Sequence, residues 1–262
     1  MARVLMRLRD FPQPMEAEID PAAHFLRVGG RERAVRDLAY DVPTIGTVYG
    51  TALNFHGALA ALDDAVNAAP YHAPPKAPVL YVKPANTWIG YGAPIPLPSG
   101  IAAVQIGATL GIVIGRAACR VPAGRALDFV AGYTIVNDVS VPHDSVYRPA
   151  VRHQCRDGFC PMGPWILRRD HVANPDALAI RAYVNDALCQ QNTTANLIRP
   201  VAQLLADVTE FITLCAGDVL LVGVPEAAPQ ARAGDRVVVE IEGVGRLENP
   251  VVAQSELAVE IA

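Results

Sequence analysis

Proline and glycine interrupt this sequence along its whole length. The 262 residues include 22 prolines and 20 glycines, spread fairly evenly. Proline lacks the amide donor that a helix interior or a central strand needs, and glycine weakens both kinds of element. The chain must therefore build short helices, short strands and many turns. Its hydrophobic fraction of 52% still supplies enough apolar surface for a large core, which excludes a wholly disordered chain.

Most of the apolar segments have the alternation or the short length of strands. We expect strands at 25–28, 47–53, 79–82, 95–98, 108–115, 133–139, 178–184, 237–241 and 247–252. Helical spacing of apolar residues predicts helices at 56–69, 126–131 and 200–213. Because strands and helices do not alternate regularly, the pattern predicts an α+β fold that is mainly β.

The chain length fits one large domain with a small appendage. Residues 1–44 form a small N-terminal segment in this prediction, and residues 45–262 form the main domain. The segment 200–213 should be the longest or second-longest helix, with Val201, Leu204 and Phe211 on its apolar face.

Charge and cysteine content exclude several classes of protein. The chain carries 22 Lys and Arg against 26 Asp and Glu, a formal net charge of −4, without a basic stripe, which argues against nucleic-acid binding. Five scattered cysteines do not form a disulfide framework and indicate a reducing compartment. No apolar run reaches the roughly 20 residues that span a bilayer. We therefore expect a cytoplasmic protein that binds neither membrane nor nucleic acid.

Asp138 follows Asn137 within the apolar run 133–139, where an unpaired carboxylate is costly to bury. One interpretation is a cap at a strand end. The other is a carboxylate that binds a metal or serves an active site. Lys83 ends the strand 79–82 and has the same two alternatives, a side chain facing a cavity or a solvated one.

A second group of candidates lies in the stretch 147–164, which concentrates basic residues in a loop. Arginines at this density can form forked contacts with carboxylates of a ligand. The alternative is a structural ion pair between Arg156 and Asp157. Cys155 and Cys160 lie near His153, but their spacing is wrong for a zinc knuckle. Buried small hydrophobic side chains are the simpler interpretation of these thiols.

Several stretches together resemble the fumarylacetoacetate hydrolase family, in order, over about residues 45–252. They are 81–84 (YVKP), 94–98 (PIPLP), 110–115 (LGIVIG), 130–134 (VAGYT), 137–139 (NDV), 157–161 (DGFCP), 163–165 (GPW), 192–194 (NTT), 214–218 (LCAGD) and 239–249. Three further stretches, 73–76 (APPK), 147–150 (YRPA) and 155–161 (CRDGFCP), are similar to one subgroup. That subgroup is the N-terminal half, or first subunit, of the bifunctional isomerases/decarboxylases of 4-hydroxyphenylacetate (homoprotocatechuate) breakdown.

The resemblance implies a mixed β-sandwich roll with a few short helices. It also implies a divalent cation, usually Mg²⁺, held by three carboxylates, at which a 2-oxo acid is bound and its enolate stabilised. A dimer, with itself or with a homologous subunit, is implied as well. On this basis Lys83 and Asp138 are the catalytic candidates. The substrate-binding candidates are Arg148, Arg152, Gln154, Arg156 and Thr193.

The sequence departs from the family pattern at the cation site. The two Glu positions fall on Gly107 and Thr109, so that Asp138 is the one carboxylate left of three. The His and Glu of the family's catalytic helix fall near Ala58 and Ala61. We therefore expect weak Mg²⁺ binding or none.

Two functions remain open. The first is an enzyme subunit acting on 2-hydroxyhepta-2,4-diene-1,7-dioate (isomerisation) or 5-oxopent-3-ene-1,2,5-tricarboxylate (decarboxylation). The second is a non-catalytic partner of a metal-competent homologous subunit. We also predict that Lys83, Asp138, Arg148, Arg156 and Asp157 converge on one cavity.

Overall fold

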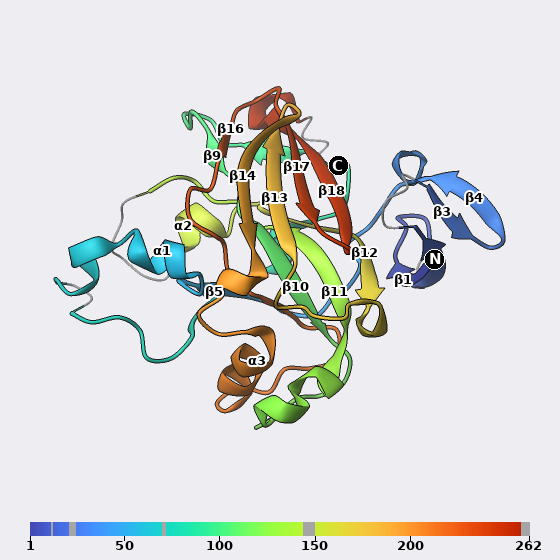
Figure 1. Ribbon diagram of the computed structural model, residues 1–262. Helices are drawn as coiled ribbons and strands as arrows, with labels where there is room; N and C mark the ends of the chain where they lie inside the picture. Colours follow the sequence, from blue (N-terminus) through green and yellow to red (C-terminus); the bar gives the residue numbers. More distant parts are fainter. Residues whose placement is uncertain (12, 21–24, 70–71, 144–149, 258–262) are drawn as a thin grey trace.

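The computed structural model describes residues 1–11, 13–20, 25–69, 72–143 and 150–257. Strands dominate it, as predicted, and form two main sheets (Figure 1). The larger sheet has the order β4-β3-β2-β1-β12-β11-β10-β15-β5-β6, with β7 paired to β12. Its strands are β1 Ala2–Met6, β2 Met15–Ile19, β3 Phe25–Val28, β4 Arg31–Ala34, β5 Val48–Ala52, β6 Val79–Lys83, β7 Trp88–Ile89, β10 Ala108–Ile114, β11 Val130–Asn137, β12 Cys160–Arg168 and β15 Val219–Leu221.

The second sheet has the order β14-β13-β17-β18-β8 and lies across strands β10 and β11 (Figure 1). Its strands are β8 Ile95–Leu97, β13 Ala179–Val184, β14 Ala187–Thr193, β17 Arg236–Ile241 and β18 Gly245–Ala253. The proline-containing β8 is an edge strand, because proline cannot donate to a central ladder. A third, small ladder joins β9 Val104–Gln105 to β16 Gln230–Ala231.

Strand β10 is the centre of the core. All seven of its residues are buried, as expected for an apolar strand covered on both faces. One face contributes Leu110 and Ile112 to the main apolar cluster between the sheets. The other face contributes Val113 to a smaller cluster that also contains Val48 and Cys160. This smaller cluster matters for function, because the candidate site lies on its side of the large sheet.

The helices are shorter than the periodicity predicts, and the predicted helix 126–131 is instead the end of the 3₁₀ element η4 and the start of β11. The predicted helix 56–69 is in fact α1 His56–Ala60 followed by the 3₁₀ turn η2 Asp63–Val66. Asp63 has a φ of 44°, which breaks the helix, and no residue of α1 or η2 is buried. Most helix stability in proteins comes from tertiary packing, so a segment without a fully buried residue does not sustain a longer helix.

The best predicted helix, 200–213, is confirmed, but it begins one residue later and ends four residues earlier than predicted. It is α3 Val201–Thr209, the longest α-helix of the described residues. Pro200 is its N-cap, and Leu204, Leu205 and Val208 are buried as predicted. Phe211, expected on the same apolar face, lies beyond the helix end and is 63% exposed. The remaining helical elements are α2 Val151–Gln154 and the 3₁₀ turns η1 Val35–Asp37, η3 Ala85–Thr87, η4 Ala123–Phe129, η5 Arg169–His171, η6 Thr194–Asn196 and η7 Gln254–Glu256.

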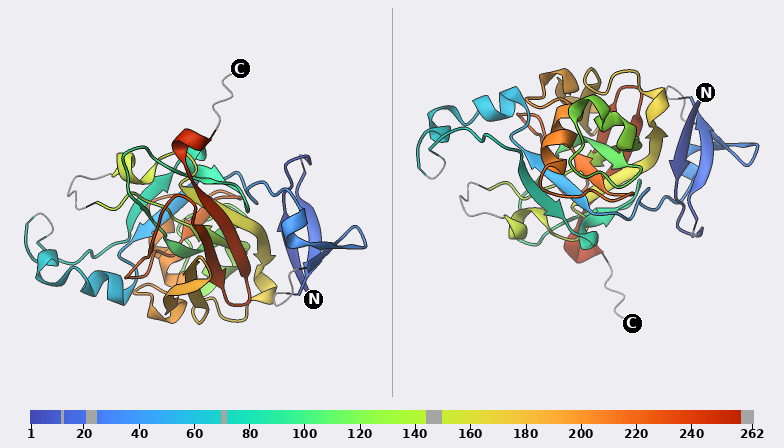
Figure 2. Two further views of the ribbon diagram at one scale, coloured as in Figure 1. Left: turned by 90° about the horizontal axis from the view of Figure 1, so that it is seen from above. Right: turned by 90° about the horizontal axis from the view of Figure 1, so that it is seen from below.

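The N-terminal strands and α1 lie at opposite sides of the molecule (Figures 1 and 2). Strand β1 extends the large sheet by pairing with β12, through Val4↔Leu167 and Leu5↔Ile166. A division of the chain at residue 44 stays a prediction. Within the described residues, no helix is both long enough and apolar enough to cross a membrane.

Candidate active site

Two polar side chains of strand β6 point to the same face of the large sheet. Tyr81 and Lys83 are two residues apart, and alternate residues of a strand share a face. Their cross-strand partners on β5 are Gly50 and Val48, respectively. A methyl group on Gly50 would lie 2.1 Å from the Tyr81 ring, so the absence of a side chain there lets the ring lie flat over the neighbouring strand. Val48 belongs to the smaller apolar cluster, which explains why Lys83 is buried.

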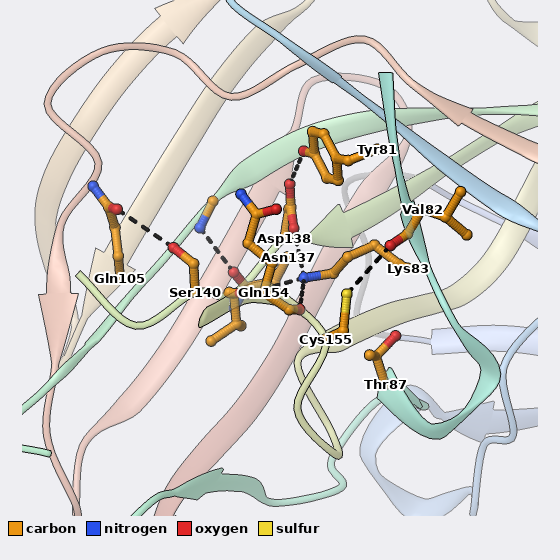
Figure 3. Close-up of polar contacts among 12 residues, drawn as sticks. Tyr81, Val82, Lys83, Thr87, Gln105, Asn137, Asp138, Ser140, Gln154 and Cys155 are labelled. Carbon is orange, nitrogen blue, oxygen red and sulfur yellow. Dashed lines mark hydrogen bonds and ion pairs between the residues drawn. The ribbon is translucent and has the colours of Figure 1, made fainter. Parts of the chain in front are cut away.

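The Lys83 ammonium is 0% exposed and contacts three oxygen atoms (Figure 3). Its Nζ lies 2.7 Å from Asp138 Oδ1. It donates to the main-chain oxygens of Val139 at 2.9 Å and Gln154 at 2.7 Å. The solvated alternative for Lys83 is therefore wrong. An ammonium group has three N–H donors, so this set of contacts uses all of them.

Asp138 lies directly after β11, and the chain uses both of its carboxylate oxygens. Oδ1 pairs with Lys83, and Oδ2 accepts a short hydrogen bond from the Tyr81 hydroxyl (Figure 3). Its main-chain N–H donates to Gly107 O at 2.8 Å, and Asn137 Oδ1 in turn accepts from Gly107 N at 3.0 Å. The carboxylate is thus paired and hydrogen-bonded, as a buried charge must be, and it is not a strand cap.

The surroundings of Asp138 keep the Tyr81 hydroxyl and the Cys155 and Cys160 thiols protonated at neutral pH. Burial, followed by the charge of Asp138, raises the pKa of Tyr81 well above its ordinary value. Burial also raises the pKa of the Cys155 thiol, and it raises that of Cys160 to about 12. Tyr81 therefore acts as a hydrogen-bond donor at neutral pH. The two thiols are not reactive thiolates, since a raised pKa leaves them protonated.

The residues at the expected ligand positions do not fit a divalent cation. A Cβ on Gly107 would lie 2.3 Å from the main-chain oxygen of Asp138 and 2.9 Å from Val224 Cγ2, which leaves no space for a side chain. Thr109 is fully buried, and its hydroxyl has no hydrogen-bond partner among the described residues. No group of three His, Cys, Asp or Glu side chains within the described ranges could hold a metal. One neutral hydroxyl and one carboxylate already in use make a poor cage for Mg²⁺.

A second polar cluster lies where α1 meets the loop after β15. Glu226 follows the loop 222–225 (VGVP), and its Oε1 accepts from Asn192 Nδ2 at 2.9 Å. The carboxyl packs on Gly57 of α1, where a Cβ would be 2.2 Å from Glu226 Cδ. Glu226 Oε2 and Gln190 Oε1 are buried without a hydrogen-bond partner in the described part of the chain. This helix side of the site therefore has two unpaired buried oxygens, whereas on the strand side Lys83 and both oxygens of Asp138 are bonded and only the Thr109 hydroxyl is unpaired among these residues.

The other predicted site residues are less closely connected to this centre. Arg148 lies outside the described residues. Arg152 is exposed, and its main-chain oxygen accepts from Arg156 Nε at 2.9 Å. Asp157 accepts from Asn86 Nδ2 at 2.7 Å, so no ion pair with Arg156 is formed. Convergence of the arginines on Asp138 stays a prediction.

Gln154 and Thr193 have structural contacts in the described residues. The main-chain oxygen of Gln154 accepts from Lys83, and Thr193 caps η6 by accepting from Ala195 N at 3.3 Å. Their roles in substrate binding stay predictions.

Sequence reasoning missed Tyr81 and Glu226. Tyr81 could have been found, because it lies two residues before Lys83 and a strand places both on one face. Glu226 had no comparable signal: its role depends on contact with Gly57, which is distant in sequence.

Comparison with known proteins matches the chain to one family. The profile of the fumarylacetoacetate (FAA) hydrolase C-terminal family matches residues 47–252. A 4-hydroxyphenylacetate degradation bifunctional isomerase/decarboxylase from Escherichia coli is 44% identical over 212 residues, which are 81% of this chain and 48% of that protein. The chain thus spans about half the length of the curated relatives that it matches first.

Solved structures share the fold over nearly the whole chain. A 2-hydroxyhepta-2,4-diene-1,7-dioate isomerase from Mycobacterium marinum has a TM-score of 0.78 and 29% identity, covering 98% of this chain and all (100%) of that one. A maleylpyruvate hydrolase from Sphingobium, solved with manganese(II) and pyruvate, has a TM-score of 0.76 and 22% identity over 95% of this chain and 99% of its own. At that identity the second likeness shows the fold alone.

Proposed function

Since the chain belongs to the fumarylacetoacetate hydrolase family, we propose that it is a subunit of an isomerase/decarboxylase system of 4-hydroxyphenylacetate breakdown. Its part in that system is the isomerisation of 2-hydroxyhepta-2,4-diene-1,7-dioate. The observation that supports this most is the array of the half-buried Tyr81 with the buried Asp138 and Lys83, because it joins a hydroxyl, a carboxylate and an ammonium group. The 44% identity to the E. coli relative supports the substrate class.

Isomerisation suits this array better than decarboxylation does. In the isomerisation a dienol loses its hydroxyl proton, the double bonds shift, and the far carbon of the diene gains a proton. The net change is a proton transfer, which a positioned acid/base group can perform. Asp138 is 8% exposed and stands between a proton donor and a cation. Decarboxylation of a 2-oxo acid instead calls for a strong electrophile for the enolate, and the residues here do not fit a divalent cation.

Because the proposed substrate is a dicarboxylate, we assign substrate binding to the arginines of the stretch 147–164. A dicarboxylate needs cationic partners, and the Lys83 ammonium is already fully used inside the protein. Arg148, Arg152 and Arg156 are therefore the side chains that we propose for the two carboxylates of the substrate. Guanidinium groups suit this role because each can donate two parallel hydrogen bonds to one carboxylate.

A second candidate function is a non-catalytic partner of a homologous, metal-competent subunit. The observation that favours it is that the Asp138 carboxylate is already bonded to Lys83 and Tyr81 within the protein. Ala58 and Ala61 of the α1 region also offer no group that moves a proton. In this case the chain would contribute an interface and would leave the chemistry to its partner.

Either function includes a dimer, which we propose with a second copy or with a homologous subunit. Strand β6 is the last strand of the large sheet, and its outer edge has no paired strand among the described residues. Val79 and Val82 on this strand are 41% and 45% exposed. An unpaired edge with exposed apolar side chains is a typical surface for association. We place the protein in the cytoplasm because all five cysteines are free thiols.

The test is an isomerase assay of the purified chain, in which the loss of dienol absorbance measures the reaction. We expect turnover by the chain alone, insensitive to EDTA and abolished in Asp138→Asn. The matched control is Asp128→Asn, an exposed carboxylate just before β11, at the opposite end of that strand from Asp138. Activity that appears only after mixing with a homologous subunit, and that survives Asp138→Asn in this chain, would support the non-catalytic partner instead.

A further inference from the structure

We propose that the cavity between strand β4 and the β17–β18 hairpin is a second ligand site, which binds a small aryl carboxylate. The cavity has a volume of about 940 Å³, and small-molecule sites typically have roughly 300–1,000 Å³. It is lined in part by the N-terminal strands β3 and β4, which lie on the side of the molecule opposite α1 (Figures 1 and 2). None of the described residues that line it belongs to the candidate active site.

Aromatic side chains from three separate segments form the apolar part of the cavity wall. They are Phe25 of β3, Tyr91 after β7 and Trp165 of β12. Phe25 is 50% exposed, so it offers apolar surface that the protein itself leaves uncovered. The Trp165 indole is fixed, because its Nε1 donates to Val244 O at 2.9 Å. Gly245 lets the hairpin approach this ring, since a Cβ there would lie 2.9 Å from Cζ2. An aryl group can make stacked or edge-to-face contacts with such a wall.

The opposite wall is charged, and most of its charges are already paired within the protein. Arg181 bonds to Glu240 at 3.0 Å, and Arg236 bonds to Glu248 at 3.1 Å. Arg246 lies between the two pairs, with a nitrogen 4.0 Å from each of the two carboxylates. This network holds the arginines of the sheet in place and gives the wall a fixed polar surface.

Arg36 is the cation of the lining that stands outside this network. Among the described residues, the carboxylate that contacts it is that of its neighbour Asp37, 3.8 Å from Nε, and both side chains are exposed. The lining as a whole has four arginines and three glutamates, an excess of one positive charge. A ligand with one carboxylate balances that charge, and a guanidinium can donate two parallel hydrogen bonds to it.

A buried hydroxyl beside the cavity also lacks an acceptor. The ring of Tyr40 meets the ring of Tyr91 edge to face, with 5.4 Å between the centroids. Tyr40 is 0% exposed, and its hydroxyl has no hydrogen-bond partner in the described part of the chain. Burial raises the pKa of both tyrosines, so both hydroxyls are protonated at neutral pH. A buried donor without an acceptor favours a ligand that brings acceptor oxygens, as a carboxylate does.

Calorimetry of the whole chain, with phenylacetate as the probe, tests the proposal. We expect saturable binding at one site per chain. Phenylacetamide has the same ring without the charge and should bind about tenfold more weakly, the effect of losing a charge-assisted hydrogen bond. Acetate has the charge without the ring and should bind at least as weakly, because it buries little apolar surface.

Substitutions show where the probe binds. Arg36→Gln should weaken phenylacetate binding about tenfold. Ala34→Trp should abolish it, because Ala34 lines the cavity and the larger side chain fills it. The matched control is Arg33→Gln, an exposed arginine next to Ala34 on the other face of the same strand. It should bind phenylacetate as the unmodified chain does, and so should Arg156→Gln, which lies outside the cavity.

The proposal is wrong if the unmodified chain shows no saturable binding of phenylacetate. It is also wrong if binding survives Ala34→Trp or is removed by Arg156→Gln, because the probe then occupies another place. If Ala34→Trp does not fold, crystals of the unmodified chain soaked in 4-bromophenylacetate decide. A bromine anomalous peak between Phe25 and Tyr91 supports the proposal, and a peak elsewhere or none overturns it. None of these readouts depends on isomerase activity, so the proposed function can fail independently.

Discussion

The strand side and the helix side of the candidate site differ in how fully their polar groups are used. On the strand side, Lys83 and Asp138 are buried, and each of their donors and acceptors has a partner within the protein. On the helix side, Glu226 and Gln190 each keep a buried oxygen without a partner in the described residues. The charges of Lys83 and Asp138 are therefore paired and hydrogen-bonded within the protein. A ligand would find unused hydrogen-bonding capacity on the helix side.

This difference follows from what each side packs against. Strands β6, β10 and β11 lie in a continuous sheet, and their site residues are fixed by register and by the smaller apolar cluster. Helix α1 has five residues, none of them buried, and begins without a side-chain cap. Substitutions should accordingly be severe on the strand side and mild on the helix side.

The largest effect is expected for Asp138→Ala. The variant leaves the Lys83 ammonium buried without its counter-ion, and breaking a buried pair in this way costs roughly 3–5 kcal/mol. Urea denaturation measures the loss of unfolding free energy. The matched control is Asp128→Ala, whose exposed ion pair with Arg169 is worth at most about 1 kcal/mol. Equal losses in the two variants would contradict the account of the strand side.

The next largest effect is expected for Gly107→Ala. We expect it to lower the unfolding free energy by about 3 kcal/mol, at the upper end of the range for overpacking. The added Cβ would be 2.3 Å from a main-chain oxygen, that of Asp138, which cannot move aside cheaply. The same clash argues that glutamates introduced at positions 107 and 109 would not create a Mg²⁺ site. We expect the double variant to unfold at lower urea concentration without gaining Mg²⁺ affinity; a folded variant that binds Mg²⁺ would refute this.

Alkaline pH should weaken the strand side next. Burial raises the pKa of Cys160 to about 12, whereas an unfolded thiol titrates near 9.0. Between these values the unfolded chain releases a proton that the folded chain retains, so the unfolding free energy falls by about 1.4 kcal/mol per pH unit for this group. Below pH 9 its contribution is constant. Urea denaturation at pH 8.5, 9.5 and 10.5 should show a shallower fall in Cys160→Ala. The exposed Cys189→Ala should keep the full slope, and identical slopes in all three proteins would exclude this cause.

The smallest effect is expected for Gly57→Ala on the helix side. The added Cβ would meet the Glu226 carboxyl at 2.2 Å, but that group is the end of a flexible side chain and can turn away. The better helix propensity of alanine, worth about 1 kcal/mol, offsets the disturbance. We expect a net change below about 0.5 kcal/mol. A loss as large as that of Gly107→Ala would show that the two sides are equally rigid.

The sequence predicted the strand side well because its signals are local. The apolar run 108–115 predicted a strand, which the structure buries along its whole length. The position of Asp138 in another apolar run identified its carboxylate as a candidate metal ligand or active-site group. The short period of a strand also connects Lys83 with Tyr81, although that inference was missed. These features follow from alternation and burial cost, which nearby residues determine.

The helix side could not be predicted in the same way. The spacing of Leu59, Leu62 and Val66 is helical, yet the structure gives only α1 and a 3₁₀ turn, and it leaves these three side chains no more than half-buried. The contact of Glu226 with Gly57 joins positions that are distant in sequence. The partner of Asp138 was equally hidden, since nothing local shows that Lys83 lies beside it.

The central claim is that Asp138 is bonded to Lys83 and Tyr81 within the protein and does not hold a divalent cation. The most direct measurement is anomalous diffraction at the manganese edge from crystals of the unmodified chain soaked in MnCl₂. The account predicts no anomalous peak near Asp138, with the Lys83 ammonium in density between its three oxygens. A manganese peak within bonding distance of the Asp138 carboxylate, with Lys83 displaced, would contradict it.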